Sequence, residues 1–357
     1  MTPVKDEKTG KWQIQFWYKN SFGENKKTTK RGFSSKRDAI DWYMNFKLSQ
    51  KGNLNMKFSN FVDIYINDMQ NKIREHTWIS KRQIIDTKIL PYFKDKKICD
   101  ISTSDIIKWQ NKVQKLTNQQ GNPYAPTYLR SINSQLSCIF NHAVRYYNLR
   151  DNPVAKVHSM GKKKSREMKF WTKEEYLKFA KAIMDKPMSY YAFECLYWLG
   201  VRIGELLALT PNDFNFEKNT VFINKSYQRI HGEDIITEPK TEQSIRTVAM
   251  PDFLADEMQD CINSIYGIKN DMRIFMITKS YLHHEMDRGT KLSGIKRIRI
   301  HDLRHSHISL LINMGFTAAE IGQRVGHTST EITDTYIHLF PTVQTNMAER
   351  LNTERMM

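Results

Sequence analysis

Cysteines and long apolar runs are scarce in this 357-residue sequence. The four cysteines (Cys99, Cys138, Cys195 and Cys261) are scattered and form no CxxC pair. This pattern argues against a zinc site or a disulfide framework and fits a reducing cytoplasm. The mean hydropathy is -0.60, and no apolar run approaches the roughly 18 residues that a membrane span requires. The first residues, MTPVKDEKTGKW, lack the apolar core of a secretory signal. We therefore expect a cytoplasmic protein.

Acidic residues are also in deficit. The chain has 38 Asp and Glu against 55 Lys and Arg, so its formal net charge is +17, and its pI is near 9.5. A pI above about 9 is typical of domains that bind nucleic acids. A merely soluble basic protein has the same composition, so charge alone does not decide the function.

Residues 1–52 predict a small β-sheet followed by a helix. The segment Trp12–Phe16 alternates apolar and polar side chains, a turn with Gly23 follows, and residues 26–33 predict further strand. A helix is expected to begin near Ser34. Trp17 and Tyr18 lie among basic residues, as in sheets that enter a DNA groove, although an idle basic module is the alternative. These predicted DNA contacts are Lys19, Lys26, Lys27, Lys30 and Arg31.

Residues 53–153 predict a compact helical domain. Phe61, Tyr65 and Met69 follow helical spacing, and prolines and a glycine separate the expected helices. Arg130 is a candidate DNA contact, although a solvated polar face explains it nearly as well. Residues 154–169 are expected to form a linker. Its basic run, which includes Lys162, Lys163 and Lys164, is either a simple connector or a segment that follows a DNA backbone.

Residues 170–357 predict a third unit with helices and a small sheet. Thr172 and Glu175 form a capping box at a helix start. Three strands, at Val221–Ile230, Ile235–Glu238 and Arg246–Met250, are expected to pair in one antiparallel sheet. After Pro341, apolar residues recur every fourth position, which predicts a short tail helix within residues 341–357. Such a helix is marginal alone and should dock on its own or another subunit.

The segment His301-Asp302-Leu303-Arg304-His305 begins a helix that is expected to end near Gly315. At about 100° per residue, His301, Arg304 and His305 share one face. Leu303, Leu310 and Met314 lie on the opposite face. We therefore expect one buried side and one side that offers a guanidinium and two imidazoles. The planar guanidinium is suited to bind two phosphate oxygens.

Four further segments carry polar residues in an ordered set. Arg202 lies in Gly-Val-Arg-Ile-Gly-Glu-Leu, where apolar neighbours predict partial burial and a need for an anionic partner, which Glu205 could itself supply. Lys240 lies in Pro-Lys-Thr at a predicted tight β-turn. His327 follows Gly326 at a helix end, where it either donates to an anion or caps the helix. Tyr336 follows nine residues later.

The order of these motifs closely resembles the tyrosine recombinase (phage integrase) family, especially integrases of temperate phages and conjugative transposons of Gram-positive bacteria. The resemblance covers the whole chain. It implies a multidomain, mainly α-helical fold with small β-sheets. An arm-type DNA-binding domain is expected at residues 1–52, a helical core-binding domain at 53–153 and an α+β catalytic domain at 170–357.

The resemblance also implies roles for the residues. Tyr336 would be the nucleophile, Arg202 and Arg304 would clamp the attacked phosphate, and His327 would donate to the same oxygens. His301 would assist proton transfer at the nucleophile, Lys240 would be the general acid, and Glu205 and His305 would support the clamp. The implied partners are double-stranded DNA with core and arm sites, three further copies of the chain in a tetramer, and accessory DNA-bending or excision factors. No cofactor and no catalytic metal are implied.

Three alternatives remain open at this point. A type IB topoisomerase shares the tyrosine chemistry but relaxes DNA without paired sites. A DNA-binding regulator could keep the fold and lack cleavage. A metal-dependent nuclease or transposase would need a ligand cluster, for which His283, His284, Glu285 and Asp287 are candidates in a stretch that reads as a loop.

Overall fold

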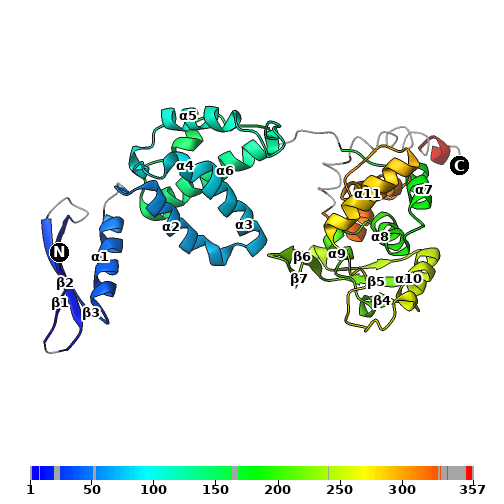
Figure 1. Ribbon diagram of the computed structural model, residues 1–357, viewed down its shortest axis with the longest axis horizontal. Helices are drawn as coiled ribbons and strands as arrows, with labels where there is room; N and C mark the ends of the chain where they lie inside the picture. Colours follow the sequence, from blue (N-terminus) through cyan, green and yellow to red (C-terminus); the bar gives the residue numbers. More distant parts are fainter. Residues whose placement is uncertain are drawn as a thin grey trace. The chain divides into compact units, whose positions relative to one another are not determined.

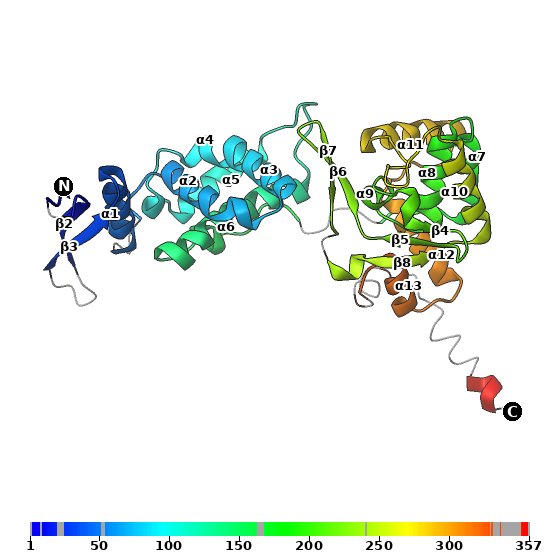
Figure 2. The same cartoon turned by 90° about the horizontal axis from the view of Figure 1, so that it is seen from below.

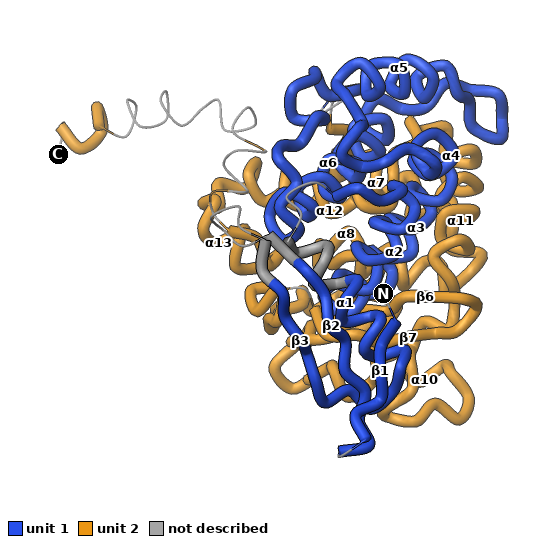
Figure 3. The backbone as a smooth tube through the Cα atoms, turned by 90° about the vertical axis from the view of Figure 1, so that its left-hand side faces the viewer, with its two compact units in different colours: residues 1–166 blue, residues 167–357 orange. Residues whose placement is uncertain are grey.

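The computed structural model divides the chain into two compact units, residues 1–166 and 167–357 (Figure 3). It describes residues 2–7, 9–19, 25–50, 54–162, 168–239, 241–328, 330, 336 and 351–355. Separate clusters of buried apolar side chains lie in the helical part of the first unit and in the second unit. Each unit is therefore organised around a core of its own.

The N-terminal part of the first unit is a three-stranded antiparallel sheet with one helix (Figure 1). Ile14 and Phe16 alternate onto its buried face and are each 1% exposed. The Phe16 ring centroid lies 4.8 Å from that of Tyr43 on the helix. The predicted sheet and helix are thus confirmed. Their bounds are β1 (Val4–Lys5), β2 (Trp12–Lys19), β3 (Asn25–Phe33) and α1 (Lys36–Gln50).

The rest of the first unit is helical, as predicted. A capping box between Ser102 and Asp105 begins one helix, and the longest helix ends at Asn148 in the left-handed conformation. Phe58, Trp109 and Phe140 lie in the core that these helices share. The elements are α2 (Phe58–Met69), η1 (Gln70–Lys72), α3 (Glu75–Ile84), the π-helical turn η2 (Ile85–Ile89), α4 (Leu90–Phe93), η3 (Ile98–Asp100), α5 (Thr103–Gln114), α6 (Pro126–Tyr147) and η4 (Pro153–Lys156).

Part of the predicted linker belongs to this helical core. Val154 and Met160 are each 2% exposed and pack in the core. Gln110 Nε2 also donates to the carbonyl oxygen of His158 at 2.9 Å. The chain therefore stays packed on the helices through residue 160, beyond the predicted linker start at residue 154. Lys163 and Lys164 lie outside the described residues.

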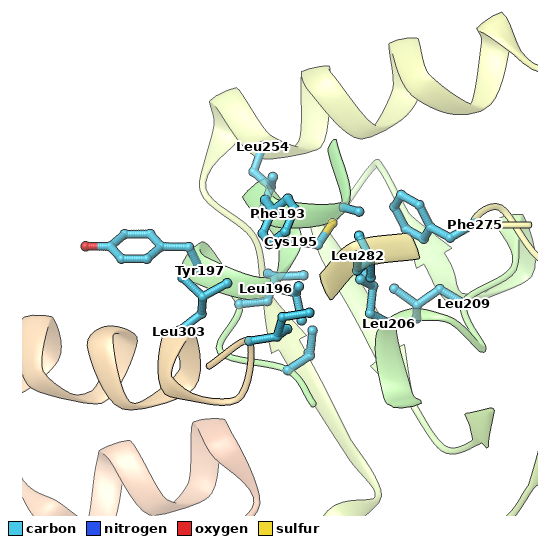
Figure 4. Packing of buried hydrophobic residues seen from close by; sticks show 14 of the residues in the cluster. Phe193, Cys195, Leu196, Tyr197, Leu206, Leu209, Leu254, Phe275, Leu282 and Leu303 are labelled. Carbon is cyan, nitrogen blue, oxygen red and sulfur yellow. The ribbon is translucent and has the colours of Figure 1, made fainter. Parts of the chain in front are cut away.

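The second unit is built around α8 (Pro187–Trp198), which is buried on nearly every side. Figure 4 shows its Phe193 near Leu254 of α10 (Asp252–Ser264) and its Leu196 and Tyr197 near Leu303 of α12 (Asp302–Asn313). A helix that is apolar all round belongs in the centre of a domain. The helices are α7 (Lys173–Ala182), α8 (Pro187–Trp198), α9 (Ile203–Leu206), η5 (Pro211–Asp213), η6 (Glu242–Ser244), α10 (Asp252–Ser264), α11 (Lys279–Ser293), α12 (Asp302–Asn313) and α13 (Ala318–Val325).

The described strands of the second unit form two sheets, so the predicted single sheet is wrong (Figure 2). The predicted strand Val221–Ile230 is divided at Asn224 and Lys225, where Lys225 Nζ lies 2.7 Å from Asp213 Oδ1. β4 (Phe214–Asn215), β5 (Thr220–Ile223) and β8 (Arg246–Ala249) form one antiparallel sheet. β6 (Ser226–Ile230) and β7 (Glu233–Thr237) form a separate hairpin. Its turn at His231 and Gly232 has φ of 52° and 87°, as tight hairpins require.

Candidate active site

Two glycines around Arg202 are explained by close packing. Gly200 has φ of +64°, and a Cβ there would lie 2.5 Å from Cδ2 of His307 on α12. A Cβ on Gly204 would lie 2.5 Å from Oγ of Ser226 on β6. Glycine is the residue that permits both the left-handed conformation and such approaches. The segment Gly200–Gly204 thus fixes Arg202 between α12 and the β6–β7 hairpin.

Arg202 is held at the N-terminus of α9 by a buried carboxylate. Its Nη1 donates to Glu205 Oε1 at 2.7 Å, and its backbone N donates to Oε2 at 3.0 Å. The Arg202 side chain is 33% exposed, so its guanidinium still reaches solvent. Burial raises the pKa of Glu205, but the opposing charges and hydrogen bonds of Arg246 and Arg202 bring this pKa below its usual value. Glu205 is therefore the anionic partner that the sequence suggested.

Arg304 is buried with hydrogen-bond donors to spare. The residue is 1% exposed. Its Nη1 donates to the Gly200 carbonyl oxygen at 2.7 Å, and its Nη2 contacts the Val325 carbonyl oxygen. Its Nε has no hydrogen-bond partner among the described residues. Burial first, and then the charge of Arg202, lower the pKa of Arg304 to about 9. A guanidinium in this environment is stabilised by an anion that accepts hydrogen bonds from its remaining N–H groups.

The helix that carries Arg304 differs from the predicted one-sided helix. α12 buries Leu303, Arg304, His307 and Ile308, which lie around most of its circumference. Met314, predicted to face the core, is 62% exposed. The reason is that α8 and α13 both pack on α12, so its polar side also faces protein. The polar residues thereby line an interior site.

His305 contacts the hydroxyl of Tyr336 through Nδ1. Tyr336 is 1% exposed, and its ring packs with Ile312, Ile321 and other apolar residues. Burial raises the pKa of Tyr336, while the charge of Arg304 opposes this shift. Burial and the neighbouring His301 lower the pKa of His305 to about 4, so its imidazole is neutral at pH 7. A neutral imidazole at this position can accept the phenolic proton.

His301 stands next to this pair, and part of the residue remains exposed. Its ring lies 5.1 Å from the ring of His305, edge to face. Desolvation and the charges of Arg304 and Arg202 lower the pKa of His301. The described hydroxyl contact of Tyr336 is with His305, whereas the family resemblance implied that His301 assists proton transfer at the nucleophile. The two imidazoles form a row that leads from solvent to the tyrosine.

His327 directly follows the end of α13. Thr317 and Glu320 form a capping box at its start, and Gly326 ends it with φ of 69°. Arg324 ties this helix to its surroundings, since its Nη2 donates to the Trp198 carbonyl oxygen and its Nη1 to that of Ala249, both at 3.1 Å. Burial lowers the pKa of Arg324. The helix end that carries His327 is thus fixed against α8 and β8.

One interior region of the second unit thus contains the buried guanidinium of Arg304 with unused hydrogen-bond donors, a second arginine, imidazoles and a tyrosine. Residues 169–342 match the phage integrase family, residues 57–114 the N-terminal SAM-like domain of phage integrases, and residues 3–50 an arm DNA-binding domain. The ICEBs1 integrase of Bacillus subtilis (strain 168) is 30% identical over 314 residues, which cover 83% of each chain. This chain belongs to the phage integrase family. It is a site-specific tyrosine recombinase.

Solved structures show the same fold. The Tn1549 transposon integrase in complex with a circular intermediate DNA superposes with a TM-score of 0.68 and 18% identity, over 85% of this recombinase and 100% of that chain. A lambda integrase tetramer bound to a Holliday junction gives a TM-score of 0.57 and 18% identity, over 90% of each chain. The predicted multidomain, mainly helical architecture is confirmed. In the described part of the recombinase, no helix is long and apolar enough to cross a membrane.

Lys240 lies outside the described residues, and so do most residues around Tyr336 and in the predicted tail. Lys240 follows β7 by three residues in sequence. Residues 351–355 are helical, and Leu351 is 70% exposed. The roles of the six predicted catalytic residues stay predictions, as do the predicted domain boundaries other than the linker start at residue 154.

The predicted DNA contacts of the recombinase lie on its surface where they are described. Lys27, Lys30 and Arg31 are exposed on β3. Lys27 Nζ lies 5.9 Å from the ring centroid of the exposed Trp17, a cation–π arrangement. The backbones of Lys19 and Lys26 lie in β2 and β3, and their side chains are outside the described part.

A cavity of about 620 Å³ opens between α3 and α6 of the helical part. Lys81, Arg130 and Lys162 line it together with hydroxyl groups such as that of Ser131. Three basic side chains around one hollow suit a phosphate backbone. It brings Arg130 and Lys162, which are 32 positions apart, to one surface.

The stretch considered as a metal site is a helix of the recombinase, so the predicted loop is wrong. His283, His284, Glu285 and Asp287 lie on α11. Glu285 is paired with Lys186 at 2.6 Å and with Arg288 at 2.8 Å. Among the described residues, no group of three or more His, Cys, Asp or Glu side chains is arranged to hold a metal ion.

Arg246 is a site residue that the sequence reasoning missed. Its Nη2 donates to Glu205 Oε2 at 3.0 Å, its Nε to the Arg324 carbonyl oxygen at 2.8 Å, and its Nη1 to that of Ser244 at 3.0 Å. The signal was present, because strand alternation puts Arg246 on the same face as the apolar Val248 and Met250. A charge on a buried strand face requires partners, and here the partners belong to the site.

Proposed function

We propose that this site-specific tyrosine recombinase cuts a DNA strand by attack of Tyr336 on a phosphodiester and rejoins it to another strand, thereby integrating or excising a mobile element. The observation that carries the proposal is Arg304, which is buried, has donors to spare and lies beside the partly exposed Arg202. A phosphodiester supplies the acceptors that this pair lacks. Preorganised cationic donors stabilise the charge that grows in the transition state.

The proposed reaction balances without an external energy source. The Tyr336 oxygen forms a bond to phosphorus, the bond from phosphorus to the 5′ oxygen breaks, and a 3′-phosphotyrosyl link results. The tyrosine loses one proton and the leaving 5′ oxygen gains one. A 5′-hydroxyl of another strand then attacks the link in the reverse sense and releases the tyrosine.

Three side chains are proposed for the proton movements. The contact between His305 and the Tyr336 hydroxyl supports His305 as a participant beside His301, since attack requires removal of the phenolic proton. Lys240 is proposed as the general acid on the strength of its motif and its position after β7. Such an acid typically contributes about 10²–10⁴ in rate. His327 is proposed to donate to the phosphate from the end of α13.

The proposed partners follow from the separate parts of the chain. We assign arm-site DNA to residues 1–52, core-site DNA to residues 53–153 and the chemistry to residues 170–357. The surface of Arg130 and Lys162 supports the second assignment. We further propose cytoplasmic action on host DNA as a homotetramer, with accessory DNA-bending factors and with the tail after Pro341 docked on a neighbouring protomer. Removal of residues 342–357 should then impair assembly on paired sites.

A suicide duplex from the ends of the host element tests the proposal. Its scissile strand carries a nick just beyond the cleavage point, so the short 5′-hydroxyl fragment diffuses away and the covalent adduct accumulates. The expected result is an adduct that Arg304→Gln abolishes and that Arg297→Gln, on the nearby surface, leaves intact. Efficient relaxation of supercoiled DNA that lacks paired sites would instead favour a topoisomerase. Absence of any adduct on cognate ends would favour a regulator without cleavage.

A further inference from the structure

Arg273 ties the β6–β7 hairpin to the body of the second unit. It lies in the segment between α10 and α11, next to the buried Ile274 and Phe275. Its Nη1 donates at 3.1 Å to the carbonyl oxygens of Leu207 and Phe275. Its Nη2 donates at 2.7 Å to Asp234 Oδ2 on β7. One guanidinium thus connects the body to the hairpin.

The hairpin side of this connection is built for the guanidinium. The Arg273 guanidinium lies over the ring of Tyr227 on β6, 4.3 Å from its centroid. The Tyr227 hydroxyl donates to Asp234 Oδ1 at 2.7 Å, which leaves Oδ2 for Arg273. The Asp234 carboxylate on β7 and the Tyr227 ring on β6 therefore both contact the Arg273 guanidinium. A planar guanidinium makes this combination of stacking and forked donation, which an ammonium does not.

The body side of the connection leads to Arg202. Leu207, whose carbonyl oxygen accepts from Arg273, directly follows α9, and Arg202 precedes the same short helix. Gly204 of α9 also packs against β6. β7 ends at Thr237, three residues before Lys240. Arg273 therefore lies between the segment of one proposed phosphate ligand and the strand that leads to the proposed acid.

We propose that Arg273 is a positioning residue that holds the β6–β7 hairpin at a fixed place relative to α9, so that Lys240 meets the leaving 5′ oxygen of the phosphate that Arg202 binds. This inference rests on the proposed function, because it requires Lys240 to be the general acid. A general acid acts only within hydrogen-bond reach of its target. A displacement near 1 Å costs on the order of 10²-fold in rate.

A sulfur substitution at the 5′-bridging position isolates this role. A thiolate leaves without a proton, so a misplaced acid slows cleavage of an oxygen substrate and spares cleavage of a sulfur substrate. The full-length variants are Arg273→Gln and Tyr227→Phe, the second of which removes only the hydroxyl that orients Asp234. Arg229→Gln is the matched control, because Arg229 is on the same hairpin, 3.8 Å from Asp234, and its Nε donates to the Gly232 carbonyl oxygen of that hairpin at 3.1 Å. Lys240→Ala reports on the proposed function itself.

Single-turnover cleavage at saturating DNA is measured for each protein on both substrates. We expect Arg273→Gln to cleave the oxygen substrate at least about 10-fold more slowly and the sulfur substrate within about 3-fold of the unaltered protein. Tyr227→Phe should show the same pattern more weakly, and Arg229→Gln should show none. Should Arg273→Gln not fold, Tyr227→Phe and Arg273→Lys take its place.

The outcomes separate the two claims. Equal defects of Arg273→Gln on both substrates, with Lys240→Ala rescued by sulfur, overturn the inference and leave the proposed function standing. Unchanged cleavage by Arg273→Gln on both substrates overturns the inference in the same way. A Lys240→Ala defect that sulfur does not rescue overturns Lys240 as the acid, and the role of Arg273 fails with it.

Discussion

Arg246 Nη2 lies 3.0 Å from Glu205 Oε2, and both side chains are nearly inaccessible to solvent. Glu205 in turn holds Arg202, and Arg246 also binds the Arg324 carbonyl oxygen three residues before His327. Its third bond goes to Ser244, four residues after Lys240. One buried arginine thus joins the three segments that carry proposed site residues outside α12 and the nucleophile.

Arg246→Lys should therefore impair cleavage although it keeps the charge. An ammonium cannot reproduce three directed bonds from one planar group, so Glu205 loses one of its orienting partners. We expect a loss of at least about 10-fold in the single-turnover cleavage rate, since small displacements of catalytic groups are costly. Core-site binding by the first unit should remain. A variant with unaltered cleavage would show that this bond network does not position the site.

Stability of the second unit should fall as the pH drops from 7 to 5. Mainly because both side chains are buried, the pKa of His305 is lowered to about 4 and that of His307 to about 3. The folded state keeps both imidazoles neutral, whereas the unfolded chain binds protons below about pH 6.5. Acid therefore favours unfolding, by roughly 2 kcal/mol for each histidine over this range. Urea unfolding at several pH values measures the slope.

The exposed His284 supplies the control for this pH dependence. His305→Gln should remove about half of the predicted slope, whereas His284→Gln should leave it unchanged. A slope that is the same in both variants would contradict the assignment to buried histidines.

The sequence predicted elements whose signals are local and missed relationships that packing creates. The capping boxes at Thr172 and Thr317 and the end of α13 at Gly326 were predictable because each depends on a few neighbouring residues. At the division between β5 and β6, Lys225 pairs with Asp213, a contact across 12 positions that no strand pattern contains. The burial of Arg304 depends on α8 and α13 together. The contact of His305 with Tyr336 likewise joins residues 31 positions apart.

Deletion of residues 1–52 should leave cleavage of a short core-site duplex within about 3-fold of the full chain, whereas recombination that depends on arm sites should fall at least about 10-fold. The N-terminal sheet has its own small core of Ile14, Phe16 and Tyr43, and the proposed chemistry lies after residue 200. Circular dichroism establishes that the shortened protein is folded. Loss of core-site cleavage by a folded truncated protein would show that the N-terminal part contributes to the active site.

The central claim is that Tyr336 is the nucleophile, and Tyr336→Phe on the suicide duplex tests it most directly. The ring packs with Ile308 and Val325 and remains in the variant, so folding and DNA affinity should be unchanged. Covalent adduct on a denaturing gel should disappear entirely, whereas Tyr266→Phe, at a fully exposed position, should form it normally. Persistent adduct with Tyr336→Phe would contradict the account and assign the attack to another tyrosine, such as Tyr227 or Tyr281.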